Sequence, residues 1–437
     1  MPGGAERAHE ESTIDAGDRV ALRPALVLFA VALALRIAAL WLLPAPEPNY
    51  NYWLARGLVT LHAFALGPEP TSFIEPLYPA FLALGMSVFD SDRLVLFLQA
   101  LVSASGAPAM FLLGWRLTGL RIGGLWAGLL YAADPYFVRQ AHSYIELPFL
   151  LPLLLWTLER LVAAQRTGQA VVGGLLTGLV LLTRTALLPT LVGTLIVMYM
   201  RRGKLALVSL AAAALVVSPW AWRSLTQNGS PVPTRAGENL FVSTSPYAVG
   251  VLPRYDADLL IRFAWLQLDA DMPATADGRE EGIADRLLAR RALEFALAHP
   301  GQAAMLKLKN AAWIFAPVLV PRNAKSPYTH AAMVNGRMEL TGLAWRPLGW
   351  ELAHGIFRTL VLVAAMIGFW RRRQIDDQWL LVVLGAELAV HVVFFPTTRL
   401  LAPFTAMLML YAGYGFALVE TLARASHSLP AEAGSHT

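Results

Sequence analysis

The sequence predicts an all-α, polytopic membrane protein with about ten transmembrane helices. Of its 437 residues, 56% are hydrophobic and 15% are charged, and the mean hydropathy is +0.51. This composition leaves too little polar surface to cover a soluble protein of this size. The apolar residues form runs of spanning length, and clusters of Lys and Arg fall in alternate gaps between those runs. A bundle of membrane-spanning helices accounts for both patterns.

The apolar runs define the expected spans. The hydrophilic residues 1–24 lack the short basic leader of a signal peptide, so we expect the first run to be retained as a helix. Residues 171–200 fit either one long tilted helix or two short helices that meet near Arg184 and Pro189. The expected spans are residues 25–43, 94–115, 122–138, 144–161, 171–182, 185–200, 205–222, 352–370, 379–395 and 400–419.

The basic clusters predict the orientation, because short cytoplasmic loops carry an excess of Lys and Arg. If residues 171–200 cross the membrane twice, every basic cluster lies on the same side as both termini. If they cross it once, the cluster at residues 201–204 lies on the opposite side. The clusters are Arg116 and Arg121, Arg160 and Arg166, Arg201 to Lys204, and Arg371 to Arg373. The expected segments are a cytoplasmic tail (1–24), a transmembrane module (25–222) with an outer loop (44–93), an outer segment (223–351), further transmembrane helices (352–421) and a cytoplasmic tail (422–437).

Composition also excludes several classes of protein. The formal net charge of +5 could suggest nucleic acid, but the basic residues lie at the ends of spans rather than along one polar face. The chain contains no cysteine, which excludes disulfides and thiolate metal sites. No P-loop, Gly-rich dinucleotide motif, HExxH or nucleophile elbow occurs. The classes that remain are proteins that act on lipid-linked substrates and transporters.

Several acids lie where chemistry could occur. Glu47 and Glu75 are in the first outer loop, where a carboxylate at a low-dielectric boundary suits a general base, although solvated loop acids are the simpler interpretation. Glu146 begins an apolar helix, whose N-terminus would stabilise its anion. Glu387 and His391 lie one helical turn apart in a span, where a packing hydrogen bond is favoured over a proton relay.

Four arginines occupy costly positions in or beside the spans. Arginine forms bidentate contacts with phosphate, but a buried arginine can equally pair with a carboxylate or with backbone carbonyls. Arg36 lies within the first span and is expected to be structural. Arg184 lies between two short spans. Arg223 and Arg399 are expected near the outer membrane surface, where a lipid phosphate would lie.

Short motifs along most of the chain resemble the GT-C glycosyltransferases. The resemblance is to bacterial proteins of glycosyltransferase family 39, which include protein mannosyltransferases and aminoarabinose transferases. Each motif is weak alone, but their order is specific. The matching positions are residues 47–56 (EPNYNYWLAR), Thr71, Phe73, 75–79 (EPLYP), 145–148 (IELP), 182–189 (LTRTALLP), Pro219, Trp220, Arg223, Gly229, Gly237, Asn239, Leu240, Arg399 and Pro403.

The resemblance implies a GT-C fold, with outer-facing interfacial helices and a site on the periplasmic face of a bacterial inner membrane. It implies a polyprenyl-phosphate sugar as donor, a periplasmic acceptor that is a lipid, glycan or protein, and an acid that deprotonates this acceptor. A divalent cation, Mg²⁺ or Mn²⁺, could be held by Glu75 or Glu146. The implied catalytic residues are Glu47, Glu75 and Glu146, and the implied substrate-binding residues are Tyr50, Tyr52, Tyr78, Arg184, Arg223, Asn239 and Arg399.

The chain departs from the family pattern at three positions. Glu47 replaces an aspartate, Asn51 replaces a tyrosine, and Ile74 replaces a residue that is often basic. The longer Glu47 side chain would shift the carboxylate. The alternative hypothesis is therefore a catalytically inactive transporter or binding protein for lipid-linked glycans. Because the polar residues gather outside rather than through the bundle, the sequence favours the enzyme.

Overall fold

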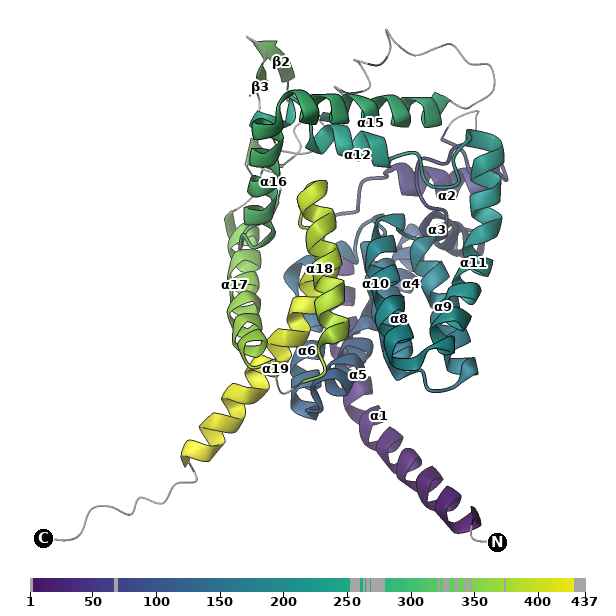
Figure 1. The fold of residues 1–437 in the computed structure, drawn as a ribbon, viewed down its shortest axis with the longest axis vertical. Coiled ribbons are helices and arrows are strands. Elements are labelled where there is room, and N and C mark those ends of the chain that lie inside the picture. The colour runs from purple at the N-terminus through teal and green to yellow at the C-terminus, as the bar shows by residue number, and fades with distance from the viewer. Residues whose placement is uncertain are drawn as a thin grey trace, which may run out of the picture.

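The computed structural model is a bundle of upright helices with a layer of helices across one end (Figure 1). We call the end at which α12 (Ala236–Ser243) and α15 (Glu280–Ala298) lie the outer end. Helices α1 (Gly3–Leu42) and α19 (Ala402–His427) extend beyond the bundle at the opposite end (Figure 1). The structure describes residues 3–66, 70–251, 260–261, 264, 268, 280–320, 323–324, 330–334, 337–341, 344–345, 348–372 and 375–427.

Five helical stretches among the described residues are long and apolar enough to cross a membrane. They belong to α1, to the consecutive helices α4 (Asp92–Ala104) and α5 (Gly106–Thr118), and to α11 (Lys204–Asn228), α17 (Leu348–Trp370) and α19. These stretches confirm a multi-pass membrane protein. Helix α1 begins at Gly3, so the stretch expected as a tail continues the first helix. The five stretches are Ala21–Leu42, Asp92–Thr118, Lys204–Asn228, Gly349–Trp370 and Ala402–Leu422.

The other expected spans correspond to shorter helices of 13 to 17 residues. The total of about ten spans therefore stays a prediction. Residues 171–200 form two helices, separated by the 3₁₀ turn η1 (Thr185–Leu187). The shorter helices are α6 (Arg121–Ala133), α8 (Leu147–Ala163), α9 (Thr167–Leu181), α10 (Leu188–Arg202) and α18 (Gln378–Val393).

Smaller elements complete the chain. They include two short antiparallel strand pairs, β1 with β4 and β2 with β3, which the prediction of an all-α protein did not include. The remaining helices are α2 (Tyr50–Thr60), α3 (Leu77–Val88), α4 (Asp92–Ala104), α5 (Gly106–Thr118), α7 (Pro135–Gln140), α11 (Lys204–Asn228), α13 (Ala248–Val251), α16 (Pro300–Ile314) and α17 (Leu348–Trp370), and the strands are β1 (Asn323–Ala324), β2 (His330–Val334), β3 (Arg337–Thr341) and β4 (Ala344–Trp345).

Local sequence explains where the helices begin and end. The Asn49 side chain accepts hydrogen bonds from the first backbone amides of α2, and Asp134 caps α7 in the same way before Pro135. Gly119 and Gly229 end α5 and α11 with φ of 69° and 72°, a left-handed conformation that glycine adopts without strain. The chain thus turns back repeatedly at both ends of the bundle.

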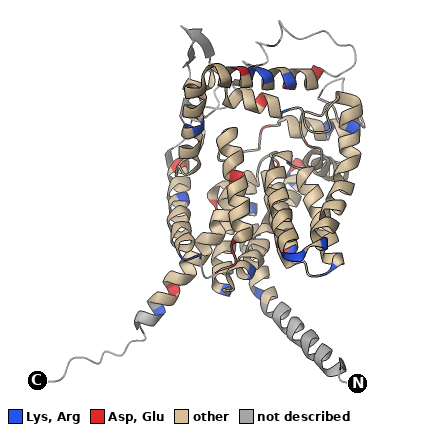
Figure 2. Ribbon diagram, in the orientation of Figure 1, with Lys and Arg blue, Asp and Glu red and all other residues tan. Residues whose placement is uncertain are grey.

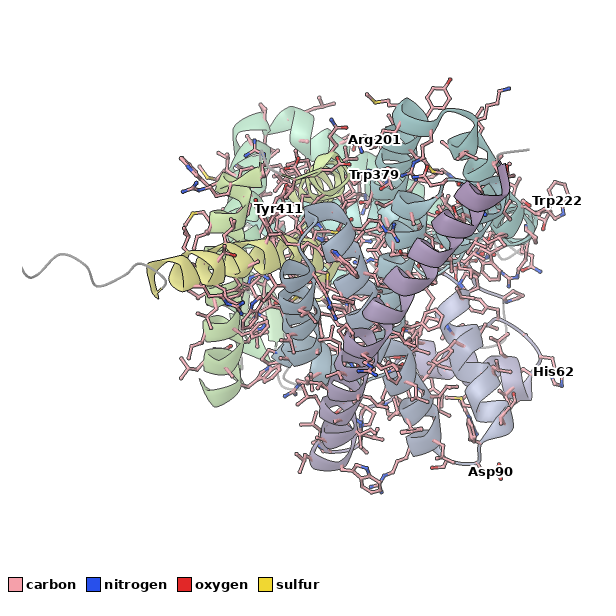
Figure 3. The ribbon with its side chains drawn as sticks, turned by 90° about the horizontal axis from the view of Figure 1, so that it is seen from below. His62, Asp90, Arg201, Trp222, Trp379 and Tyr411 are labelled. Carbon is pink, nitrogen blue, oxygen red and sulfur yellow. The ribbon has the colours of Figure 1, made fainter. Side chains whose placement is uncertain are left out.

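The basic clusters gather at the end opposite the outer end, which we call the basic end (Figure 2). Arg116 on α5 forms a 3.0 Å ion pair with Glu159 on α8. Arg201 on α10 pairs with Asp376 before α18, and its guanidinium lies 5.8 Å from the ring of Trp379 (Figure 3). These contacts bring the ends of α5, α8, α10 and the start of α18 together, as two passes over residues 171–200 require. Arg373, expected in the last cluster, lies outside the described residues.

Candidate active site

Two motifs that are more than 100 residues apart meet beneath the outer layer. Glu75 accepts hydrogen bonds from the backbone amide of Thr185, at 2.6 Å, and from its hydroxyl, at 2.8 Å. The amide of Leu77 donates to the carbonyl of Leu182 at 2.9 Å. The EPLYP run therefore fixes the turn between α9 and α10. This turn carries Arg184.

The first outer loop is fixed to the loop before α8. The side chains of Asn49 and Asn51 both donate to the carbonyl of Tyr144, at 2.8 and 3.1 Å. Asn51, which replaces a tyrosine of the family pattern, is buried and has a structural contact. These bonds hold Glu146, two residues after Tyr144, close to the start of α2.

Three arginines, which we call the arginine cluster, lie near enough to Glu146 to lower its pKa: Arg184, Arg235 and Arg399. All three act electrostatically on the Glu146 carboxylate. Arg399 also interacts with Tyr50, and Nη1 of Arg235 lies 3.5 Å from the Tyr50 hydroxyl. The four charged side chains and Tyr50 are partly exposed rather than sealed in the core. One site is thus formed by residues from five segments: α2, the loop before α8, the α9–α10 turn, the loop before α12 and the loop before α19.

The arginines determine the ionisation of their neighbours. Burial alone would raise the pKa of Glu146, but the positive charges of Arg399 and Arg184, with Arg235, lower this pKa below its ordinary value. Burial would likewise raise the pKa of the Tyr50 phenol, and Arg399 and Arg235 again reverse the direction. Glu146 is therefore a carboxylate at neutral pH, which suits a counter-ion better than a proton donor.

Arg184 carries an unused hydrogen-bond donor. Its Nη1 atom is buried, and no described group accepts a hydrogen bond from it. Buried donors of this kind are rare in proteins because each one costs about 1–3 kcal/mol. A donor that lacks a partner within a cluster of positive charges is expected to bind an anionic group.

Arg235 was not identified from the sequence, although it comes two residues before the glycine of the Gly-x-Asn-Leu motif. Its guanidinium lies 4.7 Å from the Phe73 ring and 5.5 Å from the Tyr50 ring, and it pairs with Glu238 at 3.3 Å. The motif glycine explains how the segment is placed. A Cβ at Gly237 would lie 1.8 Å from the backbone oxygen of a residue in α15, so only glycine permits this approach.

Helix α15 holds the outer elements over the arginine cluster. Its Asp285 accepts hydrogen bonds from the first amides of α12, that of Gly237 at 2.7 Å among them. Its Glu281 accepts from the Thr71 hydroxyl at 2.5 Å and from the Ser72 amide at 3.0 Å. Two acids of α15 therefore position two loops of the site.

The structure gives two predicted site residues, Arg223 and Tyr78, partners within the protein. Arg223 donates to backbone oxygens of the first outer loop, that of Thr71 at 3.1 Å among them, and stacks on Trp220 at 4.4 Å. Tyr78 is 1% exposed and donates to Gln99 at 2.7 Å, so it is part of the core. Arg223 and Tyr78 therefore have structural contacts.

The remaining predicted residues lie at the rim or make no side-chain contact. The Tyr52 hydroxyl lies 3.5 Å from Asp92, and its ring packs on Tyr144. Asn239 is partly exposed on α12, and its side chain has no hydrogen bond to a described residue. Glu47 is exposed in the loop before α2, where no described residue pairs with its carboxylate.

Two further polar positions in the bundle are structural, as expected. Arg36 donates to the Ser103 hydroxyl at 2.8 Å and to the Ala132 carbonyl at 3.2 Å. Nδ1 of His391 lies 2.6 Å from the carbonyl oxygen of Glu387, whose side chain accepts a bond from Thr190. These contacts are packing hydrogen bonds.

The geometry does not suit a divalent cation. Among the described residues, no group of three or more His, Asp and Glu side chains is close enough to hold a metal ion. One carboxylate oxygen of Glu75 is occupied by Thr185, and Glu146 faces three positive charges. A cation would be repelled there, whereas an anion would be attracted.

Two comparisons of the sequence with known proteins found no match, and a comparison of the structure found distant matches. No family model matches the sequence, and no curated protein sequence matches it. Among solved structures, the chain is similar to ArnT from Cupriavidus metallidurans bound to undecaprenyl phosphate, with 15% identity and a TM-score of 0.41 over 93% of this chain and 81% of that chain. The apo state of ArnT gives 16% identity and a TM-score of 0.40 with the same coverage.

The chain is also similar to the arabinosyltransferase EmbB from Mycobacterium smegmatis, with 16% identity and a TM-score of 0.34 over 91% of this chain and 42% of that chain.

Proposed function

We propose that this chain is a membrane glycosyltransferase that moves a sugar from a polyprenyl-phosphate donor to an acceptor at the outer face. The observation that carries the proposal is the arginine cluster with the free Nη1 of Arg184. Guanidinium groups bind phosphate oxygens through paired hydrogen bonds, and a partly enclosed site strengthens each of them. The cluster lies beneath the outer layer of a membrane protein, where we expect the phosphate of a lipid-linked donor to bind.

The proposed reaction is a direct displacement in which Glu47 is the base. The acceptor oxygen bonds to the anomeric carbon while the bond from that carbon to the donor phosphate breaks. The electron pair leaves with the lipid phosphate, and the acceptor proton passes to the Glu47 carboxylate. The arginine cluster stabilises the charge that develops on the phosphate. Glu47 is exposed in the protein without substrate. A bound acceptor would therefore lie between the Glu47 carboxylate and the arginine cluster.

We propose further that the site faces the periplasm of a bacterial inner membrane and that both termini are cytoplasmic. The basic end, with Arg116, Arg201 and their neighbours, is then the cytoplasmic side, in agreement with the positive-inside rule. The proposed partners are the lipid-linked donor, the surrounding lipids and a periplasmic acceptor. The sugar and the acceptor are to be found experimentally.

Transfer by the purified protein tests the proposal. The assay uses the full chain in lipid nanodiscs, a panel of radiolabelled polyprenyl-phosphate sugars and a membrane extract as acceptor. Replacing Glu47 by Gln keeps the shape of the side chain but removes the base, so transfer should fall by about 100-fold or more. Glu294→Gln, on the exposed face of α15, is the matched control and should leave transfer unchanged.

The alternative outcomes are distinct. Undiminished transfer by Glu47→Gln would refute the role of Glu47 as base but not the glycosyltransferase. A wild-type protein that binds a donor without transferring its sugar would favour the carrier. Failure of every donor to bind would refute a lipid-phosphate site.

A further inference from the structure

The turn between α9 and α10 carries Arg184, and hydrogen bonds fix the backbone on both sides of that residue. Two residues before Arg184, the carbonyl of Leu182 accepts from the amide of Leu77 at 2.9 Å. Directly after Arg184, the amide and the hydroxyl of Thr185 both donate to Oε1 of Glu75, at 2.6 and 2.8 Å. The EPLYP run is therefore bonded to the turn at two points, and the backbone that carries Arg184 is held before any ligand binds.

Glu75 caps a helix that belongs to a distant part of the chain. Thr185 is the first residue of η1, which runs directly into α10 at Leu188. Amides at a helix N-terminus have no acceptor within their own helix, and a carboxylate placed there also interacts favourably with the helix dipole. Without the Glu75 carboxylate, the Thr185 amide and hydroxyl would lose this acceptor. The turn would then have to move to find another.

The Arg184 side chain depends on this turn for its direction. Its Nη1 atom is buried, and no described residue accepts a hydrogen bond from it. That end of the guanidinium is therefore oriented by the backbone from which the side chain extends. Hydrogen bonds weaken steeply as their distance and angle depart from the ideal, so a small shift of the turn would weaken a contact between Arg184 and a phosphate oxygen.

We infer that Glu75 is a positioning residue, which acts through Thr185 to hold the Arg184 guanidinium where it meets the phosphate of the donor. This inference rests on the proposed function, in which Arg184 binds that phosphate. The role differs from the one that the family resemblance implies for Glu75, a catalytic acid or a cation ligand. Both bonds from Thr185 go to Oε1. A catalytic role would instead use the second oxygen, Oε2, so a change at Oε2 separates the two roles.

A double-mutant cycle on ligand binding tests the inference. The full-length protein in nanodiscs is titrated with farnesyl phosphate, a short polyprenyl phosphate. Thr185→Val keeps the size of the side chain but removes its hydroxyl, so the affinity should fall about tenfold, whereas Thr185→Ser should stay within about twofold of the wild type. In Arg184→Gln, which has already lost the guanidinium, adding Thr185→Val should cost no further affinity. A substitution that only loosened the fold would lower the affinity in both backgrounds.

Thr183, on the other side of Arg184, provides the matched control. Its hydroxyl donates to the carbonyl of Leu179 in α9 at 2.9 Å. Thr183→Val therefore removes one hydroxyl hydrogen bond, as Thr185→Val does, and the two variants should have similar melting temperatures. Only Thr185→Val should weaken the binding of farnesyl phosphate.

Sugar transfer by variants of Glu75 separates positioning from chemistry. In Glu75→Gln the side-chain carbonyl takes the place of Oε1 and can accept both bonds from Thr185, so transfer should stay within about tenfold of the wild type. Glu75→Ala removes the acceptor, and transfer should fall by about 100-fold with a rise in the KM for the donor. A residue that takes up a proton or binds a cation through Oε2 would lose its role as fully in Glu75→Gln as in Glu75→Ala.

The outcomes separate this inference from the proposed function. Unchanged binding by Thr185→Val, or an equal loss with and without Arg184, would refute the positioning role, and so would a Glu75→Gln variant as inactive as Glu75→Ala. The proposed function would survive each of these results. If a folded wild-type protein neither binds farnesyl phosphate nor transfers a sugar, the proposed function fails and this inference fails with it.

Discussion

Lys307 on α16 is a partly buried cation whose contacts are to neutral oxygens. Its ammonium donates to the Thr244 hydroxyl at 2.6 Å and to the Ser243 hydroxyl at 3.3 Å, and it also contacts the carbonyl of Val393. Burial lowers the pKa of Lys307 from 10.5 to about 8. The Lys307 side chain thus links α16 to the end of α12 and the end of α18. Burying its positive charge costs free energy, which opposes this arrangement.

The low pKa of Lys307 predicts that stability at the outer end rises with pH. Between about pH 8 and pH 10.5 the unfolded chain binds a proton that the folded chain has released, so the free energy of unfolding rises with pH across this window. Below about pH 8 both states bind the proton, and this contribution no longer changes with pH. Amide exchange in α12 and α16, corrected for its intrinsic rate, should show several-fold more protection at pH 9.5 than at pH 7. Lys307→Met should abolish this dependence.

Lys309, two residues along the same helix, provides the control. Among the described residues, its ammonium reaches only the carbonyl of Val249, at 3.4 Å. Lys309→Met should keep the pH dependence of the wild type. If Lys307→Met kept it as well, another group would be responsible.

Residue types alone could not separate binding arginines from structural ones. The burial of Arg36 could be predicted because it lies within an apolar run. Arg223 and Arg235 both lie near aromatic residues and motif glycines, yet only Arg235 reaches the cluster. The two arginines differ in the backbone groups that each guanidinium contacts once the loops have folded. Acids of α15, about 50 residues beyond Arg235 in the sequence, hold those loops in place, and no local sequence pattern reveals a contact between residues so far apart.

Small residues determine how the long helices cross. A Cβ at Gly368 on α17 would lie 2.0 Å from the carbonyl oxygen of Tyr411 on α19, and a Cβ at Gly415 would lie 2.2 Å from that of Ala364. Glycines at such crossings let helix backbones approach closely in a membrane, where burial of apolar surface gives little driving force. The pairing of α17 with α19 therefore depends on glycines rather than on large side chains.

A matched pair of alanine substitutions tests this packing. Gly368→Ala places a methyl group against a carbonyl oxygen, so it should destabilise the fold by about 1–3 kcal/mol and lower the melting temperature in detergent by several degrees. Gly385→Ala on α18 meets no atom within 4 Å, and it should be neutral or stabilise by up to about 1 kcal/mol. A Gly368→Ala variant as stable as Gly385→Ala would contradict the close crossing.

At the scale of the whole molecule, charge was a better guide than length. Hydropathy did not decide whether residues 171–200 form one helix or two, whereas the positions of the basic residues favoured two. The structure has two helices there, α9 and α10. The sequence could not supply the strand pairs near residues 323–345 or the continuation of α1 to Gly3, because neither depends on an apolar run. The convergence of five distant segments at one site is likewise a property of the assembled bundle.

The absence of cysteine from the chain allows a direct test of orientation. Asp90, exposed between α3 and α4 (Figure 3), and Lys204, exposed at the start of α11, lie on opposite sides of the membrane if the basic end is cytoplasmic. In intact spheroplasts, a membrane-impermeant maleimide should label Asp90→Cys strongly and Lys204→Cys only after permeabilisation. His62→Cys and Arg166→Cys, at two further exposed positions, should behave like Asp90→Cys and Lys204→Cys respectively. The reverse pattern would place the arginine cluster on the cytoplasmic side, so that a periplasmic acceptor would be out of reach.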